Sequence, residues 1–266
     1  PGGDASAIRA PATADIAATL LQPEARGIHM SRLYLRLQDE LGHKALSPAL
    51  LAQVLRDCID SQSGLADRAR LTLRYAHLLR RPALASSYSG WKDYPVTIEA
   101  VVDPQGMTLT LSFSVEYSST CPASAALSRQ LNARRFNEDF GTTGEVSAER
   151  VGEWLASERG LAATPHAQRS RADIRVQLAD AGDGLPLESL VDAIEQALAT
   201  PVQTAVKRED EQAFARLNAE NLMFCEDAAR RVAAVLSADA RVVRFDATVS
   251  HFESLHAHDA VASVSG

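Results

Sequence analysis

The sequence predicts an α+β protein in which antiparallel strands form a sheet and helices cover one face of it. Apolar and polar residues alternate over residues 96–102 and 109–117, on either side of a turn at residues 103–106. This pattern is typical of a long hairpin that is buried on one face. Elsewhere, apolar residues repeat at helical spacing between further alternating stretches, which favours helices packed on the same sheet.

The other elements follow from the same two periodicities. Ser47 is a suitable N-cap and Pro48 a suitable first-turn residue, so a helix is expected from there toward Gly64. Further strands are expected at residues 28–37, 69–75, 172–178 and 243–249. Further helices are expected at residues 187–198 and 208–237, the second one broken near 218–221, and residues 125–165 are polar and expected to be mostly helical.

Composition limits the class of protein. The chain has 266 residues, 46% of them hydrophobic and 23% charged, which is ordinary for a globular protein with a real core. No apolar run is long enough to span a bilayer, and the start shows no basic-then-apolar signal pattern. The net charge of −7 argues against nonspecific nucleic-acid binding. Three cysteines argue against a disulfide framework, so we expect a cytoplasmic protein. From the charge and the lack of a long apolar run, we expect no nucleic-acid or membrane partner.

Three polar stretches hold residues that could carry chemistry. Cys121 ends an alternating strand and is followed by Pro122. Cys58 lies on an apolar helical face and Cys225 follows Phe224 near a helix start, and both are expected to be small buried hydrophobes. His166 precedes a strand, and residues 250–259 contain three histidines and two carboxylates. A thiolate, imidazoles and a carboxylate together suit Zn²⁺, or Mn²⁺ and Fe²⁺ as oxygen ligands increase. Because the spacing shows neither CxxC nor HExxH, the residues alone leave both a metal site and unrelated polar loops open.

Six short motifs, in order, resemble those of the type IB GTP cyclohydrolases, and they cover residues 26–260. They are RGIHMSR at 26–32, STCP at 119–122, HAQRS at 166–170, KREDE at 207–211, CED at 225–227 and FESLHAHDA at 252–260. Each motif is weak alone, but the shared order makes coincidence a poor explanation.

The resemblance implies a fold of two tandem tunnelling-fold (T-fold) modules. On this chain they would be residues 26–124 and 166–266, preceded by a flexible arm at 1–25 and separated by a helical insertion at 125–165. It also implies a homo-oligomer, expected to be a tetramer, with active sites at the subunit interfaces.

The resemblance further implies a divalent metal ion and a set of site residues. The metal ligands would be Cys121, His166, Glu211 and His256. Glu226 would accept hydrogen bonds from the guanine edge of GTP, and Glu253 and His258 are candidates for proton transfer. Contacts to the rest of the nucleotide, including its triphosphate, are expected from Ser31, Arg32, Gln168 and Arg169.

Two departures from the family pattern matter. Ala123 stands where the family motif has a second cysteine, so Cys121 has no local disulfide partner and one thiol that might assist catalysis is gone. Cys121 and His166 are separated by 45 positions (166 − 121), where the family pattern implies about a dozen. Since loop closure grows only logarithmically more costly with length, we expect the insertion to loop out and leave its ends together.

The function implied is conversion of GTP and water to formate and 7,8-dihydroneopterin triphosphate, the first step of tetrahydrofolate biosynthesis. A metal-bound water would add at C8 of guanine. Two alternatives stay open: a related tunnelling-fold purine or pterin enzyme, such as an iron-dependent cyclohydrolase with a cyclic phosphate product, and a catalytically silent metal-binding paralogue. Ala123, in place of the second cysteine of the motif, is the reason to retain the alternative of a catalytically silent paralogue.

Overall fold

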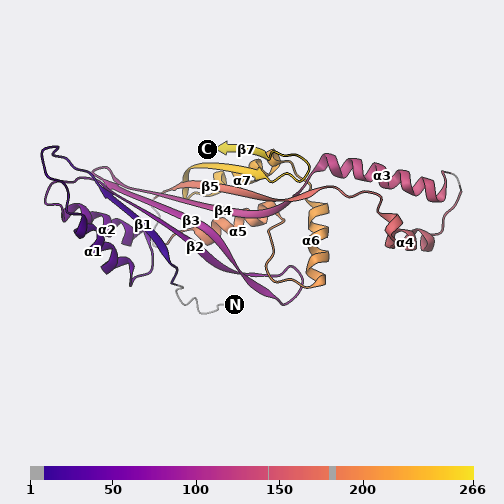
Figure 1. Cartoon of the computed structure of the whole chain (residues 1–266), viewed down its shortest axis with the longest axis horizontal. Coiled ribbons are helices and arrows are strands. Elements are labelled where there is room, and N and C mark those ends of the chain that lie inside the picture. The colour runs from indigo at the N-terminus through magenta and orange to yellow at the C-terminus, as the bar shows by residue number, and fades with distance from the viewer. Residues whose placement is uncertain (1–8, 143, 180–183) are drawn as a thin grey trace.

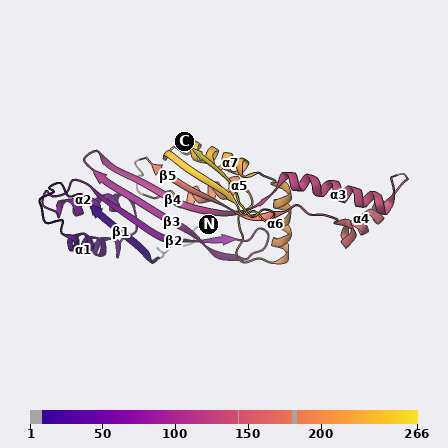
Figure 2. The ribbon, with the colours of Figure 1, turned by 45° about the horizontal axis from the view of Figure 1, so that its top comes forward.

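The computed structural model describes residues 9–142, 144–179 and 184–266. Its centre is one seven-stranded antiparallel sheet whose strands are neighbours in chain order (Figures 1 and 2). The strands are β1 (Ala12–Ala18), β2 (Ala69–Pro82), β3 (Ser89–Asp103), β4 (Gly106–Thr120), β5 (Ala167–Leu178), β6 (Val242–His251) and β7 (Ala260–Ser265). The helices are α1 (Met30–Leu41), α2 (Pro48–Asp60), α3 (Pro122–Phe140), α4 (Ala148–Ala156), the short 3₁₀ helix η1 (Glu158–Gly160), α5 (Leu187–Leu198), α6 (Arg208–Glu220) and α7 (Cys225–Ala238).

One face of the sheet is apolar because the strand registers align the alternating residues. Leu73, Ile98, Leu111, Val176 and Phe245 are paired in turn from β2 to β6, and all are buried. The helix α2 covers this face near β2 and β3, with α1 packed against α2, and α5 and α7 cover it near β4, β6 and β7. The described residues therefore form an α+β fold with helices on one sheet face, as predicted.

The opposite face of the sheet is polar. Residues of β3 to β6 line an open hollow of about 340 Å³ there, among them Thr97, Ser112, Asp173, Arg175 and Thr248. No described helix is long and apolar enough to cross a membrane.

Helices are inserted at three points of the meander. The helices α1 and α2 lie between β1 and β2, and α5, α6 and α7 lie between β5 and β6. The third insertion, α3 with α4, leaves from the end of β4 and projects away from the sheet (Figure 1). In the same figure α6 lies across that end of the sheet, and α1 and α2 lie at the other end.

Most of the predicted elements are present. The long hairpin is β3 and β4, joined at residues 103–106, and α2 begins at Pro48 with the Ser47 hydroxyl accepting from Leu50 N–H at 3.2 Å. The predicted helical insertion contains α3 and α4, and the predicted break near residues 218–221 separates α6 from α7.

Two predictions are wrong and one strand was not expected. Residues 28–37 were predicted as a strand, but α1 begins at Met30, because Leu33, Leu37 and Leu41 lie one helical turn apart and pack toward α2. The predicted flexible arm at residues 1–25 contains a strand, since β1 pairs with β2. Residues 1–8 of the arm lie outside the described part of the chain. β7 was not expected, because its alternating residues are mostly small.

Candidate active site

The apolar face of the sheet becomes polar at the end where β4 leads into α3. Val115, Ala172 and Val249 form the last apolar row across β4, β5 and β6. Two polar rows follow: Tyr117, Ser170 and His251, then Ser119 and Gln168 with Glu253 just beyond the end of β6. Polar side chains from three chain segments thus gather at one sheet end, most of them buried beneath the surface.

Cys121 and His166 are neighbours at this end. Cys121 follows β4 and is the N-cap of α3, and its backbone N–H donates to the carbonyl oxygen of His166 at 3.3 Å. The Ser124 hydroxyl accepts from the backbone N–H of His166 at 3.1 Å. The insertion of α3 and α4 therefore loops out and returns to its starting point, as predicted.

The imidazole of His166 is held by polar neighbours. Its Nδ1 lies 2.9 Å from Oε1 of Gln168 and 3.9 Å from Oε2 of Glu253. Gln168 in turn donates from Nε2 to Oε1 of Glu253 at 3.4 Å, and the hydroxyl of Ser254 lies 3.4 Å from Nδ1. Because the closest partner of Nδ1, Oε1 of Gln168, accepts a hydrogen bond, the proton belongs on Nδ1, and Nε2 keeps a free lone pair.

Glu226 lies beside this cluster on the first turn of α7. The backbone N–H of Met223 donates to the carbonyl of Thr120 at 3.2 Å, which places the start of α7 next to the end of β4. The Glu226 side chain is exposed, and the thiol of Cys225 lies 3.4 Å from its Oε2. Burial, and to a lesser extent the nearby Glu226, raises the pKa of Cys225 to about 11. The thiol therefore stays protonated and donates its hydrogen bond to the Glu226 carboxylate.

A buried pair lies beneath Glu226 and Glu253. The hydroxyl of Tyr117 is 2.8 Å from Nε2 of His251, and the side chains are 0% and 3% exposed. Burial lowers the pKa of His251, an effect that the negative charges of Glu253 and Glu226 partly oppose. Burial, followed by the nearby Cys225, raises the pKa of Tyr117. Both groups are therefore neutral at neutral pH.

Glu211 and the two predicted loop histidines are not joined to Cys121 and His166. Glu211 is exposed on the first turn of α6, where its neighbour Asp210 is buried and accepts from the backbone N–H groups of Ala85 and Ser86, each at 2.8 Å. His256 and His258 are exposed and stack on each other with ring centroids 5.1 Å apart. Within the described part of a single chain, no three histidine, cysteine or acidic side chains are grouped closely enough to hold a metal ion.

Ser31 and Arg32 lie on a different part of the sheet. Ser31 lines an open hollow of about 710 Å³ together with Asp15 and Arg74, and the guanidinium of Arg32 donates to the carbonyl of Ser61. Arg74 is level in register with Ser112, which is about 26 Å along β4 from its end at roughly 3.3 Å per residue. These two residues and Cys121 of the same chain cannot contact one small ligand.

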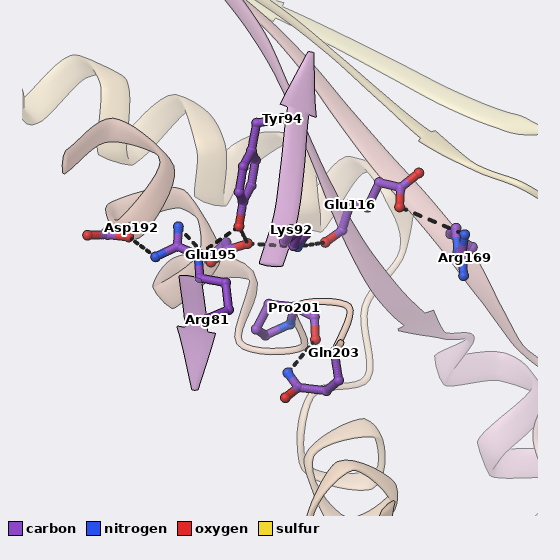
Figure 3. A network of polar contacts seen from close by, with 9 residues as sticks. All are labelled: Arg81, Lys92, Tyr94, Glu116, Arg169, Asp192, Glu195, Pro201 and Gln203. Carbon is purple, nitrogen blue, oxygen red and sulfur yellow. Dashed lines mark hydrogen bonds and ion pairs between the residues drawn. The ribbon is translucent and has the colours of Figure 1, made fainter. Parts of the chain in front are cut away.

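Arg169 follows Gln168 on β5 and therefore faces the opposite side of the sheet, where it joins a separate network (Figure 3). Its guanidinium is 3.8 Å from the carboxylate of Glu116, whose backbone carbonyl accepts from Lys92 at 3.4 Å. Lys92 also donates to Glu195 at 2.8 Å. The same carboxylate accepts from the hydroxyl of Tyr94 at 2.7 Å and pairs with Arg81 at 3.2 Å. The contacts of Glu195 therefore join α5 to β2 and β3.

His251, Tyr117 and Ser170 are not among the residues predicted for the site. The alternation of residues 243–249 provides the missing signal, because continuing it by one step places His251 on the buried face. A histidine at a position where the pattern calls for an apolar residue indicates a buried polar contact.

Residues 2–262 match the family described as type I GTP cyclohydrolase folE2. The "GTP cyclohydrolase FolE2" of Chromohalobacter salexigens is 50% identical over 257 residues, which cover 97% of this chain and 83% of that protein. The protein of the same name from Pseudomonas putida is 48% identical over 254 residues, covering 96% of this chain and 84% of that protein.

Two solved uricases are similar in fold alone. The uricase from Bacillus fastidious covers 96% of this chain and 81% of its own with a TM-score of 0.52 at 8% identity. The uricase from Arthrobacter globiformis covers 95% of this chain and 84% of its own with a TM-score of 0.50 at 6% identity. The α+β arrangement of this chain is thus similar in overall fold to these two uricases.

Proposed function

Since this chain belongs to the type I GTP cyclohydrolase folE2 family, we propose that it is a GTP cyclohydrolase of type IB. It converts GTP and water to formate and 7,8-dihydroneopterin triphosphate, the first step of tetrahydrofolate biosynthesis, in the cytoplasm. The observation that carries the proposal is about 50% identity to a named cyclohydrolase along 97% of the chain. The clustering of Cys121, His166, Gln168 and Glu253 at one sheet end supports it.

Glu226 is the proposed guanine anchor. Its exposed carboxylate stands at the N-terminus of α7, where the helix dipole favours a negative charge. An ionised carboxylate accepts hydrogen bonds from both the ring N–H and the exocyclic amino group of guanine. Adenine presents a different donor pattern at that edge, so pairing with Glu226 discriminates GTP from ATP.

The donor set at the sheet end fits a divalent metal ion. Cys121 supplies a thiol, and His166 presents Nε2 with its tautomer fixed by Gln168 on Nδ1, the arrangement that metal-ligating histidines use. We propose Glu211 and His256 as the remaining ligands, with Mn²⁺, Zn²⁺ or Fe²⁺ as the ion. When bound, such an ion would lower the pKa of a water molecule and orient it toward C8 of guanine.

The protein's own groups then handle protons. Glu253 is held by Gln168 at 3.4 Å and lies 3.9 Å from Nδ1 of His166, so its carboxylate stands ready to take a proton as the imidazole ring of guanine opens. His258 is a second candidate for this transfer, on the exposed loop after β6.

A homo-oligomer, proposed to be a tetramer, completes the site. In a single chain, Ser31 and Arg32 lie far from Cys121, and Glu211 and His256 are not grouped with it. At a subunit interface, Ser31, Arg32, Glu211 or His256 of one subunit can lie beside Cys121 of another. The edge strands β1 and β7 and the polar sheet face offer surfaces for such association.

We further propose that the sheet contains two tandem tunnelling-fold modules, at about residues 26–124 and 166–266, separated by the insertion at 125–165. Two groups of helices, each inserted between neighbouring strands and packed on the same face, support this division. The insertion supports it too, since α3 and α4 leave and re-enter at adjacent residues.

Product analysis tests the function. GTP incubated with the protein and Mn²⁺, Zn²⁺ or Fe²⁺ should release formate and a product that becomes a fluorescent neopterin triphosphate on oxidation. A cyclic phosphate product would instead assign the chain to the related cyclohydrolases. Metal binding without any turnover would make it a silent paralogue, with Ala123 as the first residue to revert to cysteine.

A further inference from the structure

The helix α6 is held on the sheet by polar contacts near both of its ends. It lies across the sheet end that carries the candidate site (Figure 1). In α6, every residue of which the structure describes, Asp210 is the only buried one, so no apolar side chain of this helix is fully enclosed. A helix without a buried apolar stripe gains little orientation from hydrophobic packing. Its place on the sheet therefore depends on specific hydrogen bonds.

The first anchor of α6 is Asp210, in the first turn of the helix. Its carboxylate accepts from the backbone N–H groups of Ala85 and Ser86, each at 2.8 Å, in the connection between β2 and β3. The hydroxyl of Ser86 donates to the same carboxylate at 2.6 Å, and the backbone N–H of Lys207 donates to it at 2.8 Å. The start of α6 is thus fixed to the connection between β2 and β3.

The second anchor is Asn218, in the last turn of α6. Its Oδ1 accepts from the hydroxyl of Ser118 at 2.6 Å and from the hydroxyl of Thr120 at 3.3 Å, both on β4. Its Nδ2 donates to the backbone carbonyl of Phe214, one turn earlier, at 2.9 Å. Because a carbonyl can only accept, this last bond must come from Nδ2, which leaves Oδ1 to face the two hydroxyls. The carboxamide of Asn218 therefore has one orientation, and it joins α6 to the end of β4.

The contacts of Asn218 reach the residue immediately before Cys121. Thr120 is the last residue of β4 and is 3% exposed. Its side chain donates to Asn218, and its backbone carbonyl accepts from the N–H of Met223 at 3.2 Å, in the segment that leads into α7. The strand end from which Cys121 extends is therefore held both through the side chain and through the main chain of Thr120.

We propose that Asn218 is a positioning residue for the metal site: by holding the two hydroxyls at the end of β4, it fixes the direction in which Cys121 presents its thiol. The inference rests on the proposed role of Cys121 as a metal ligand. Asn218 itself touches neither the metal nor GTP. Because α6 also carries Glu211, about two turns before Asn218 on the same face of the helix, the contact joins the segments of two proposed ligands.

Variants of Asn218 and of a matched asparagine separate this role from a general effect on α6. Asn218→Ala removes the contact with β4, whereas Asn218→Asp keeps an oxygen that accepts from both hydroxyls. Asn221→Ala is the control, because the Asn221 carboxamide donates to the carbonyl of Leu217 at 2.9 Å, the same helix bond that Asn218 makes. Ser118→Ala removes the shorter contact from the β4 side, so the proposal stays testable even if Asn218→Ala does not fold.

Cobalt binding measures the effect without relying on turnover. Metal-free protein titrated with Co²⁺ should develop the absorption of a thiolate-to-cobalt charge transfer, and Cys121→Ala should lack it. We expect Asn218→Ala to bind Co²⁺ roughly 10- to 100-fold more weakly, with a weaker charge-transfer band at saturation, as for other residues that orient a metal ligand. Ser118→Ala should show part of this loss. Asn218→Asp should recover most of the affinity, and Asn221→Ala should match wild type.

Three results would count against the proposal. Wild-type affinity and an unchanged band in both Asn218→Ala and Ser118→Ala would overturn it. Equal losses in Asn218→Ala and Asn221→Ala would also overturn it, because they would reflect a general effect on α6. A charge-transfer band that persists in Cys121→Ala, or that the wild type lacks, would refute the metal role of Cys121 in the proposed function, and the role of Asn218 with it.

Discussion

The backbone N–H of Cys121 donates to the carbonyl oxygen of His166 across 3.3 Å, although 45 positions separate the two residues (166 − 121). This bond continues the ladder of β4 and β5 by one step beyond the Thr120–Ala167 pair. The insertion that holds α3 and α4 therefore begins and ends at a strand pair whose register is set by the sheet. A thiol and an imidazole are brought to one point by sheet register rather than by loop geometry.

The insertion should be dispensable for the fold. Replacing residues 127–162 with a short Gly-Ser linker should leave a folded protein, because α3 and α4 contact each other through Phe136 and Trp154 and both contact η1 rather than the sheet. The Trp154 indole, for instance, donates to Asp139 at 2.7 Å within the insertion. Circular dichroism and the thermal midpoint check this, and loss of cooperative unfolding would contradict it.

Glu226→Gln should weaken GTP binding selectively. The amide presents an N–H₂ group where guanine also presents donors, so KM for GTP should rise roughly 10- to 100-fold. The thermal midpoint should not change, since the side chain is exposed. Steady-state kinetics measure KM for GTP in wild type, Glu226→Gln and the control Glu220→Gln, which changes another exposed glutamate. An unchanged KM would remove Glu226 from the guanine site.

His251 should make stability depend on pH below neutrality. Its pKa in the folded protein is lowered from 6.5 by burial, so the unfolded state binds a proton first as pH falls. The stability contributed by neutral His251 is complete above pH 6.5 and is lost as pH falls toward the folded-state pKa. The thermal midpoint of wild type should thus drop more between pH 7 and pH 5 than that of His251→Gln. Parallel curves for the two proteins would contradict this.

The buried carboxylate of Glu195 should be important for stability. It pairs with Lys92 at 2.8 Å and Arg81 at 3.2 Å, and its side chain is 12% exposed (Figure 3). Glu195→Gln leaves Lys92 without a counter-charge and Arg81 with only the exposed Asp192, and should cost about 3–5 kcal/mol in the free energy of unfolding. Asp192→Asn is the matched control, since that carboxylate pairs with Arg81 but is 59% exposed, and should cost about 0–1 kcal/mol. Urea denaturation measures both, and equal costs would contradict the account.

Elements with strong periodicity could be predicted from the sequence. The hairpin of β3 and β4 alternates large apolar residues with polar ones, and α2 has both a Ser47 cap and a helical stripe. Where the signal is weak, tertiary contacts decide. β1 and β7 carry mainly alanines on their inward positions and are strands because a long neighbour pairs with them. In α1, Leu33 and Leu35 suggest alternation, but packing against α2 selects the helical stripe through Leu33 and Leu37.

The candidate site could be predicted only in part. Motif order pointed to Cys121, His166, Gln168 and Glu253, and the structure brings these residues together. It could not indicate that His251 pairs with Tyr117, because that contact spans 134 positions and depends on the shared register of β4, β5 and β6. Glu211 and His256, which we propose as further ligands, are not grouped with Cys121 and His166 within the described part of one chain, and we propose that subunit association brings them together.

The central claim, that Cys121 holds a catalytic divalent metal, is tested most directly by measuring bound metal and formate release together. Wild type, Cys121→Ala and Cys58→Ala would be stripped of metal, reloaded with Mn²⁺, Zn²⁺ or Fe²⁺, desalted and given GTP. The account predicts that wild type and Cys58→Ala, whose lost thiol is on the buried face of α2, retain the metal and release formate, whereas Cys121→Ala does neither. Metal retention and formate release by Cys121→Ala at the wild-type level would contradict it.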